Sequence, residues 1–431
     1  MAVIVIVDHL IKLILFGVLF IQLSFGSEFA SVLPTDVNIS ERRYLLYDVN
    51  YGEGFNLRRD VYMRVANTVR LLRNDGHNYI LVLPPWGGLY HWKRQDKKLP
   101  WSLLFDISSL NEFVPVIEFE QFLYEINYDG IDNVAYLQHY AEGWTSGNYV
   151  RKYDFRECLE ENHYRKINKK WHGWFFGYDD VWSRNFSCIS IQGDSATLVN
   201  LIEQYYPTTT SLFIDRAEHI LHDLFGDKYY WQARRSMRYA KHLIDIGNNF
   251  RRDRLGSTDA IDKTELLGSW IETQKSHGDA LGGDYLCVHW RRRDFVRAHE
   301  KDIPSINGTA VQISKCLEKN HLTHLFLSTD AAREEVEMLT KFLPDKTSVL
   351  RYVPDSALTD AEVSIIDQWI CAHGRWFIGT HYSTFSYRIQ EDREILGFKP
   401  ETTFNRLCPD DNSNCEQPAK WRITYDNNEY F

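Results

Sequence analysis

Short apolar segments alternate with amphipathic ones along most of this chain. Apolar runs at residues 44–49 and 79–83 predict two buried strands, and the amphipathic stretch between them, residues 58–73, predicts a helix. Strands that alternate with helices in this way predict a parallel, doubly wound sheet. The further elements predicted in this half are strands near residues 134–137 and 211–214 and a long helix near residues 230–250.

A second pattern of the same kind follows a polar, glycine-containing stretch at residues 251–283, which is the predicted connection between two domains. The strands predicted beyond it are residues 285–289, 325–327, 348–353 and 375–379. The helices predicted there are residues 309–319, 332–342 and about 363–371, with another after a Ser/Thr-rich turn near residue 383. We therefore predict an α/β fold with two Rossmann-like domains, residues 41–250 and 251–431, that face each other across a cleft. The C-terminal tail is expected to pack back on the first domain.

The N-terminus contains a separate apolar run, residues 13–23, which follows Lys12 and precedes small residues near position 26. This pattern is typical of a secretory signal peptide, here residues 1–26. An uncleaved signal anchor is the alternative, but the run is shorter than the roughly 20 residues that a spanning helix needs. No later segment is long and apolar enough to span a membrane, so we expect no membrane span after cleavage.

A secretory protein can form disulfides and carry N-glycans. Cysteines in polar, loop-like surroundings are predicted to form the bridges Cys158–Cys188 and Cys408–Cys415. Cysteines inside apolar patterns are predicted to remain reduced in the core, namely Cys287, Cys316 and Cys371. Sequons that predict surface positions and glycosylation occur at Asn38, Asn185 and Asn307.

A cationic cluster follows the predicted strand at residues 285–289. His289, Trp290 and the arginines at 291–293 stand where that strand ends, at the sheet edge where α/β proteins bind ligands. The chain as a whole is acidic, with Lys+Arg 49 against Asp+Glu 59, so the arginines do not belong to a nucleic-acid-binding surface. The guanidinium fork suits a phosphate or diphosphate. An arginine cluster paired with acids at a domain interface is the alternative.

Residues 52–56, which read Gly-Glu-Gly-Phe-Asn, follow the first predicted strand. Flanking glycines let the backbone approach a ligand and take unusual dihedral angles, and a carboxylate held there can act as a general base. A turn glutamate stabilised by the start of a helix explains the same residues. The aromatic loop at residues 84–92 either lines a groove for a polypeptide or a sugar, or is a packed Ω-loop without a ligand.

Two features of the second half suit a nucleotide. Asp367 lies in an apolar helical segment and needs donors, which either guanine or a neighbouring arginine can supply. Ser383 and Thr384 open a helix after a strand, where hydroxyl and backbone N–H groups can bind phosphate or simply cap the helix. The sequence contains no Asp-x-Asp pair for a divalent ion, so arginine and helix N-termini are expected to neutralise a diphosphate. No metal site is predicted.

Four segments together resemble the protein O-fucosyltransferases that modify thrombospondin type 1 repeats. They are residues 53–60, 83–87, 289–295 and 366–373, and the similarity extends from about Tyr44 to Tyr425. The His-x-Arg-Arg element alone is shared with α1,2- and α1,6-fucosyltransferases. The resemblance implies a GT-B fold and inverting transfer of fucose from GDP-β-L-fucose to a Ser or Thr hydroxyl of a folded repeat. It further implies the endoplasmic reticulum lumen as location and no obligatory metal or other cofactor.

The resemblance also implies roles for single residues. Glu53 matches the catalytic base, Arg291 the diphosphate ligand and Asp367 the guanine ligand. The implied GDP-fucose site is Gly52, Glu53, Gly54, Phe55, Asn56, His289, Trp290, Arg291, Asp367, Ser383, Thr384 and Phe385. Asp392 stands where the family has a functionally required Glu, so its catalytic role is open and Glu391 could substitute. An O-fucosyltransferase of EGF repeats and a non-catalytic, fold-sensing chaperone are the remaining alternatives.

Overall fold

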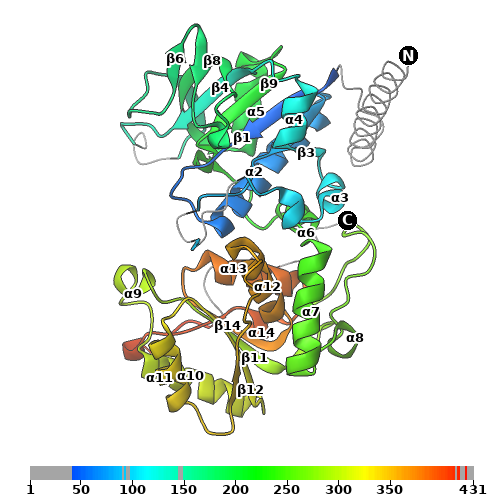
Figure 1. Cartoon of the computed structure of the whole chain (residues 1–431), viewed down its shortest axis with the longest axis vertical. Coiled ribbons are helices and arrows are strands. Elements are labelled where there is room, and N and C mark those ends of the chain that lie inside the picture. Colours follow the sequence, from blue (N-terminus) through cyan, green and yellow to red (C-terminus); the bar gives the residue numbers. More distant parts are fainter. Residues whose placement is uncertain are drawn as a thin grey trace, which may run out of the picture.

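The computed structural model describes residues 41–89, 92–93, 98–143, 149–412, 415–417 and 423–424. The predicted signal peptide, residues 1–26, and the sequon at Asn38 lie outside the described residues. The described chain forms two α/β domains stacked along the long axis of the molecule (Figure 1). Within these ranges, we find no helix that is both long and apolar enough to cross a membrane.

The first domain is built on a sheet that has ten strands among the described residues. Its main path is β3-β2-β1-β9-β4-β8-β7-β6, and β5 and β10 both pair with β8. The strands with parallel partners are β1 (Arg43–Tyr47), β2 (Tyr79–Leu83), β3 (Val116–Glu118), β4 (Ile131–Gln138), β8 (Ser183–Asp194), β9 (Ser211–Asp215) and β10 (Ile220–Leu221). The antiparallel additions are β5 (Lys152–Phe155), β6 (Arg165–Ile167) and β7 (Lys170–His172).

Alternate residues of β1 build the core on both faces of this sheet, as the two-residue period of a strand requires. Leu45 and Tyr47 belong to the cluster that contains the buried face of α2 (Phe55–Asn74). Tyr44 and Leu46 pack instead in the cluster that contains α4 (Phe119–Glu125). The other helical segments of this domain are η2 (Trp101–Leu103), α3 (Ile107–Asn111), η4 (Phe175–Gly177), α5 (Ser195–Tyr205), η5 (Ala217–His219) and α6 (Lys228–Ser236).

The second domain contains a fully parallel sheet of order β13-β12-β11-β14-β15. Its strands are β11 (Gly283–Trp290), β12 (His324–Thr329), β13 (Ser348–Leu350), β14 (Gly374–Gly379) and β15 (Asn405–Arg406). The helices around it are α8 (Asp259–Asp262), α9 (Phe295–Ala298), α10 (Ile306–Lys319), α11 (Arg333–Phe342), α12 (Asp360–Ala372), α13 (Thr384–Leu396), α14 (Pro400–Thr403) and η6 (Asp410–Asn412). Alternation along β11 again divides the core, because Cys287 packs with α12 while Leu286 and Val288 pack with α10.

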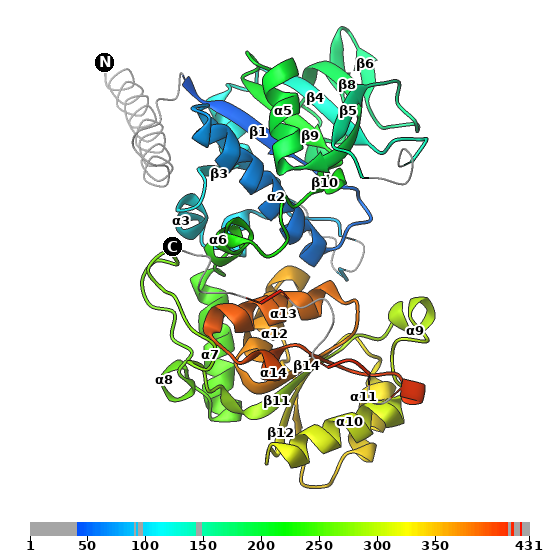
Figure 2. The same cartoon turned by 180° about the vertical axis from the view of Figure 1, so that it is seen from behind.

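The long helix predicted near residues 230–250 is wrong as a single element. The chain leaves α6 at Met237, whose ψ of 56° is not helical, and begins a new helix, α7 (Lys241–Leu255). α7 packs on α12 of the second domain, as Figures 1 and 2 both show. The contact is close, because a Cβ added at Gly247 would lie 2.6 Å from Trp369. The domain division that we predicted at residue 250 therefore falls inside α7, and we propose residues 237–240 as the passage between the domains.

The disulfide prediction is partly right. Cys158–Cys188 and Cys408–Cys415 are bridged, as predicted, and Cys316 is the free cysteine of the described residues. Cys287 and Cys371, predicted to be reduced, instead form a third bridge with a Cα–Cα distance of 5.2 Å. Their apolar surroundings correctly indicated burial, but β11 and the last turn of α12 bring the two thiols together in the core.

Two peripheral features complete the fold. The sequon residues Asn185, on β8, and Asn307, in α10, are both exposed. Near the C-terminus, Ile423 lies against the loop that precedes α6, where a Cβ added at Gly226 would stand 2.6 Å from its Cγ2 atom. The last described part of the chain thus contacts the first domain.

Candidate active site

The loop between β1 and α2 carries Glu53 at the carboxyl end of a central strand. Gly54 precedes the first residue of α2 with φ −77° and ψ 165°, an ordinary extended conformation. Neither Gly52 nor Gly54 adopts a positive φ, so the unusual backbone angles that we expected from the sequence are not present. A Cβ added at Gly52 would meet no described atom within 4 Å. Gly52 thus provides open space beside the loop, and not backbone strain.

The environment of Glu53 raises the pKa of its carboxyl group. The side chain is half-buried. Burial raises its pKa, the negative charge of Glu218 raises it further, and Arg58 opposes the rise. A carboxylate with a raised pKa binds a proton more firmly than an ordinary glutamate does, which suits a general base.

The aromatic loop next to Glu53 is part of the core. Trp86 is 4% exposed and Trp92 is 7% exposed. The ring of Phe55 meets Trp86 edge to face at a centroid distance of 5.0 Å. For the described residues of this loop, the interpretation as a packed Ω-loop is therefore the better one, and Phe55 helps to anchor the start of α2 to it.

His289, the last but one residue of β11, stacks on an aromatic ring. Its imidazole stacks on Phe385 with centroids 4.3 Å apart, and its Nδ1 atom lies 2.8 Å from the Ser386 hydroxyl. Burial, assisted by Arg291, lowers the pKa of His289 to about 3, so the ring is neutral at physiological pH. Trp290 points into the hydrophobic core and is 2% exposed, which leaves its backbone as the part best placed to meet a ligand.

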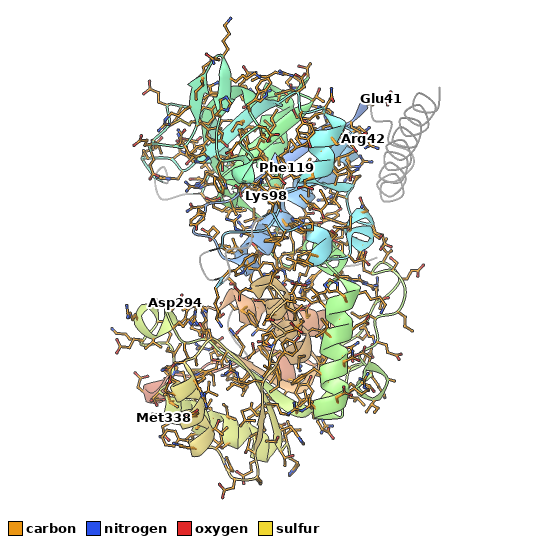
Figure 3. The ribbon with its side chains drawn as sticks, viewed as in Figure 1. Glu41, Arg42, Lys98, Phe119, Asp294 and Met338 are labelled. Carbon is orange, nitrogen blue, oxygen red and sulfur yellow. A yellow bond between two sulfur atoms is a disulfide. The ribbon has the colours of Figure 1, made fainter. Side chains whose placement is uncertain are left out.

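Arg291 is held by acids on both sides. Its guanidinium group pairs with Asp330 and with Asp294, the latter at 2.5 Å. Its backbone N–H donates to the Thr380 hydroxyl at 3.0 Å. Figure 3 shows Asp294 on the side of the second domain that faces the first. An arginine oriented in this way can exchange a carboxylate for a phosphate oxygen when an anion binds.

The turn from β14 to α13 presents the start of a helix beside Arg291. In the described structure the Ser383 hydroxyl makes no cap hydrogen bond to α13, so the capping alternative does not hold for this residue. Thr384 and Phe385 are the first two residues of α13, where backbone N–H groups have no partner within the helix. Such a helix start attracts phosphate groups.

Asp367 projects from α12 toward the end of β12. Its carboxylate accepts a hydrogen bond of 2.9 Å from Ser328. Burial raises its pKa to about 7, while the Ser328 hydrogen bond and the charge of Arg351 act in the opposite direction. A half-buried acid with this pKa responds strongly to any ligand that brings further donors.

The predicted base and the predicted guanine ligand lie on segments in direct contact. Gln368, the neighbour of Asp367, donates a hydrogen bond of 2.8 Å to Asn56, which stands three positions after Glu53. Arg59 donates to the same Gln368 side chain at 2.7 Å. The fold thus joins the Glu53 segment of one domain to the Asp367 helix of the other.

Asp392 is buried and accepts hydrogen bonds inside the protein. Its two carboxylate oxygens accept hydrogen bonds from Arg234 at 2.5 Å and from Tyr239 at 2.7 Å. Glu391 likewise binds Arg234 at 2.5 Å and accepts from Tyr230. All of these side chains are buried between α6 and α13, so the geometry favours a structural role for Asp392. Its catalytic role stays a prediction.

Sequence reasoning missed this interdomain network. Arg59, Arg234 and Gln368 were not among the predicted site residues, although arginines inside apolar helical segments are a usable signal for buried ion pairs. Among the described residues, no group of three or more His, Cys, Asp or Glu side chains could hold a metal ion.

The chain was compared with known proteins. It matches the family model described as GDP-fucose protein O-fucosyltransferase over residues 44–396. It is 54% identical over 390 residues to GDP-fucose protein O-fucosyltransferase 2 of Caenorhabditis elegans, covering 90% of this chain and 91% of the relative. The human GDP-fucose protein O-fucosyltransferase 2 is 47% identical over 394 residues, again with 90% and 91% covered.

The solved structure of POFUT1 in complex with GDP-fucose superposes with a TM-score of 0.55 and 14% identity, covering 86% of this chain and 98% of that chain. At that identity the likeness shows the fold alone. The two α/β domains share the GT-B fold with that structure. The chain belongs to the GDP-fucose protein O-fucosyltransferase family.

Proposed function

We propose that this protein transfers fucose from GDP-β-L-fucose to a Ser or Thr hydroxyl of a folded thrombospondin type 1 repeat, with inversion at the anomeric carbon. The observation that carries the proposal is the half-buried Glu53 carboxylate, which lies after β1 on a segment bonded to the helix of Asp367. The relatives named GDP-fucose protein O-fucosyltransferase 2 support the choice of reaction.

The donor is proposed to bind the second domain. The carboxylate of Asp367 can accept the ring N–H and the exocyclic amine of guanine together. The start of α13, with Ser383 and Thr384, offers N–H and hydroxyl donors to the phosphates. Arg291 supplies the bidentate cation for the diphosphate. The solved complex of POFUT1 with GDP-fucose shares this fold, which supports the assignment of the donor.

The chemistry is proposed to be a single displacement. Glu53 accepts the proton of the acceptor hydroxyl, whose oxygen forms the new bond to the anomeric carbon. The bond from that carbon to the diphosphate breaks, and its electron pair leaves with GDP. Arg291 stabilises the charge that grows on the diphosphate, so its contribution is largest in the transition state. A second carboxylate nucleophile is not needed for an inverting transfer.

The acceptor and the location are proposed from the disulfides and the N-terminal pattern. The disulfides Cys158–Cys188, Cys287–Cys371 and Cys408–Cys415 suit an oxidising compartment. Together with the N-terminal pattern at residues 1–26, they favour the endoplasmic reticulum lumen as the place of action. A folded, disulfide-bonded repeat is the acceptor expected in that compartment.

The test is an assay of GDP release with purified protein and GDP-fucose. The acceptors are a folded thrombospondin type 1 repeat, its reduced and alkylated form, and a folded EGF repeat. Release with the folded thrombospondin repeat alone supports the proposal. Release with the EGF repeat would transfer the assignment to that acceptor, and no release with any acceptor would favour a non-catalytic chaperone. Equal rates on the folded and reduced forms would contradict recognition of a folded domain.

A further inference from the structure

One side chain of α2 makes hydrogen bonds to the loop that carries Glu53. Arg58 reaches three acceptors of this loop at once. Its Nε atom donates to the carbonyl of Glu53 at 3.1 Å, and a terminal nitrogen donates to the carbonyl of Asn50 at 3.2 Å. Its other terminal nitrogen lies 3.3 Å from the carboxylate of Asp48, the first residue after β1. One guanidinium group therefore spans the loop from its beginning to Glu53.

A second side chain holds the same loop from the opposite side. Glu218, in η5, accepts a hydrogen bond of 3.1 Å from the backbone N–H of Asn50. Its other oxygen accepts from Arg216 at 2.6 Å, which fixes the direction of the carboxylate. The N–H of Ala217 donates to the carbonyl of Asp48 at 2.9 Å and secures the base of the loop. Asn50 is thus bonded through its N–H to η5 and through its C=O to α2.

We propose that Arg58 and Glu218 are a pair of positioning residues that fix the Glu53 loop for the incoming hydroxyl and balance the charge around it. The inference rests on the proposed function, in which Glu53 is the base. The position of Arg58 supports a dedicated role, because a cation in the first turn of a helix is disfavoured by the helix dipole. Its contacts with the loop offset that disadvantage.

The pair acts on Glu53 with opposite signs. Glu218 raises the pKa of the Glu53 carboxyl group and Arg58 lowers it. Asp48 also faces Arg58, and burial raises its own pKa to about 7. Arg64 from α2 and Arg216, the residue before η5, also lower the pKa of Glu53. Removal of Arg58 should therefore raise the pKa of Glu53, and removal of Glu218 should lower it.

The experiment measures kcat and KM across the acidic limb of the pH profile for three variants of the full chain. Arg58→Met removes both the charge and the fork, so the limb should move to higher pH. Glu218→Gln keeps an acceptor for Asn50 but removes the charge, so the limb should move to lower pH. Arg58→Lys keeps the charge but not the three contacts. We therefore expect kcat to fall about tenfold or more, while the acidic limb of the pH profile stays near its wild-type pH.

The control is Arg333→Met, which breaks an exposed ion pair with Glu337 on α11 and should change none of these quantities. KM for GDP-fucose should change less than kcat in all variants, because the proposed guanine and diphosphate ligands, Asp367 and Arg291, lie in the second domain. If Arg58→Met does not fold, Arg58→Lys and Glu218→Gln still decide the question. Shifts in the same direction, or profiles like that of Arg333→Met, would overturn the inference. Near-normal turnover of Glu53→Ala would instead remove the proposed base itself.

Discussion

Gln368 on α12 and Asn56 on α2 share a hydrogen bond of 2.8 Å across the domain junction, although 312 positions separate them in the chain. Arg59 donates to the Gln368 oxygen, so the same amide is satisfied at both ends by the first domain. Neither Asn56 nor Gln368 is charged, and the contact therefore depends on geometry more than on the electrostatic field. It connects the segment of the proposed base to the helix of the proposed guanine ligand.

Removing this connection should affect stability and rate together. Gln368→Ala leaves the guanidinium group of Arg59 without its closest acceptor, and we expect a loss of about 1–3 kcal/mol of unfolding free energy. We also expect a lower kcat, because Asn56 would no longer be fixed. Thermal unfolding and steady-state kinetics measure both. Gln204→Ala, at an exposed glutamine of α5, is the matched control and should change stability by no more than about 0.5 kcal/mol.

Mutations of Glu53 and of Arg291 should have different effects on GDP binding and turnover. Glu53→Ala should reduce turnover by about 10²–10⁴-fold while GDP-fucose still binds, because only proton transfer is removed. Arg291→Ala should weaken both GDP binding and turnover, and Arg291→Lys should restore neither fully, since an ammonium group lacks the fork. Calorimetric titration with GDP and single-turnover transfer distinguish the cases. Retained turnover in Glu53→Ala would point to another base.

GDP affinity should depend on pH through Asp367. Its pKa in the free protein is raised to about 7, so below that value the carboxyl group is protonated and cannot accept two guanine donors. Affinity should therefore rise as pH increases through about 7, and binding should release a proton. Titrations in buffers of different ionisation enthalpy measure this release. Asp367→Asn should bind more weakly and lose this part of the pH dependence, which separates it from titration of the diphosphate.

The bridge Cys287–Cys371 should contribute to stability. The double variant Cys287→Val, Cys371→Ala should lose about 2–4 kcal/mol of unfolding free energy. Cys316→Ser, at the half-buried free cysteine, is the control and should retain the three bridges. Thiol titration of the denatured, unreduced protein should find one thiol per chain. A count of three would contradict the core bridge.

Activity should survive chelation. The sequence offers no Asp-x-Asp pair, and Arg291 with the start of α13 can neutralise the diphosphate instead. Transfer measured with and without EDTA should agree within error. Complete loss of turnover in EDTA, restored by manganese or magnesium, is the result that would refute this expectation.

Local pattern predicted the fold best where strands are buried on both faces. The run at residues 79–83 became β2 with the same bounds, and residues 285–289 became the centre of β11. β8 was missed, because its polar residues interrupt the apolar pattern and the strand is defined by its neighbours β4 and β5. The break between α6 and α7 was also missed. It occurs at residues 237–240, the proposed passage between the domains, and depends on tertiary structure and not on the local pattern.

The candidate site was predictable to the level of segments but not of partners. The sequence placed Glu53, Arg291 and Asp367 at strand ends or on the adjoining helix, which the fold bears out. It could not show that Asp392 binds Arg234, nor that Cys287 meets Cys371, because both pairs depend on tertiary contacts between distant segments. Arg58 and Glu218 were overlooked because each acts on backbone groups of the Glu53 loop.

The buried pair of Arg234 and Glu391 has a consequence for biosynthesis. The two residues are 157 positions apart, and translation at roughly 5–20 residues per second separates their appearance by about 8–30 seconds. Throughout that interval the nascent first domain exposes a cation that finds its partners only when α13 emerges. The contacts of Arg234 with α13 can therefore form only after nearly all of the chain has been synthesised.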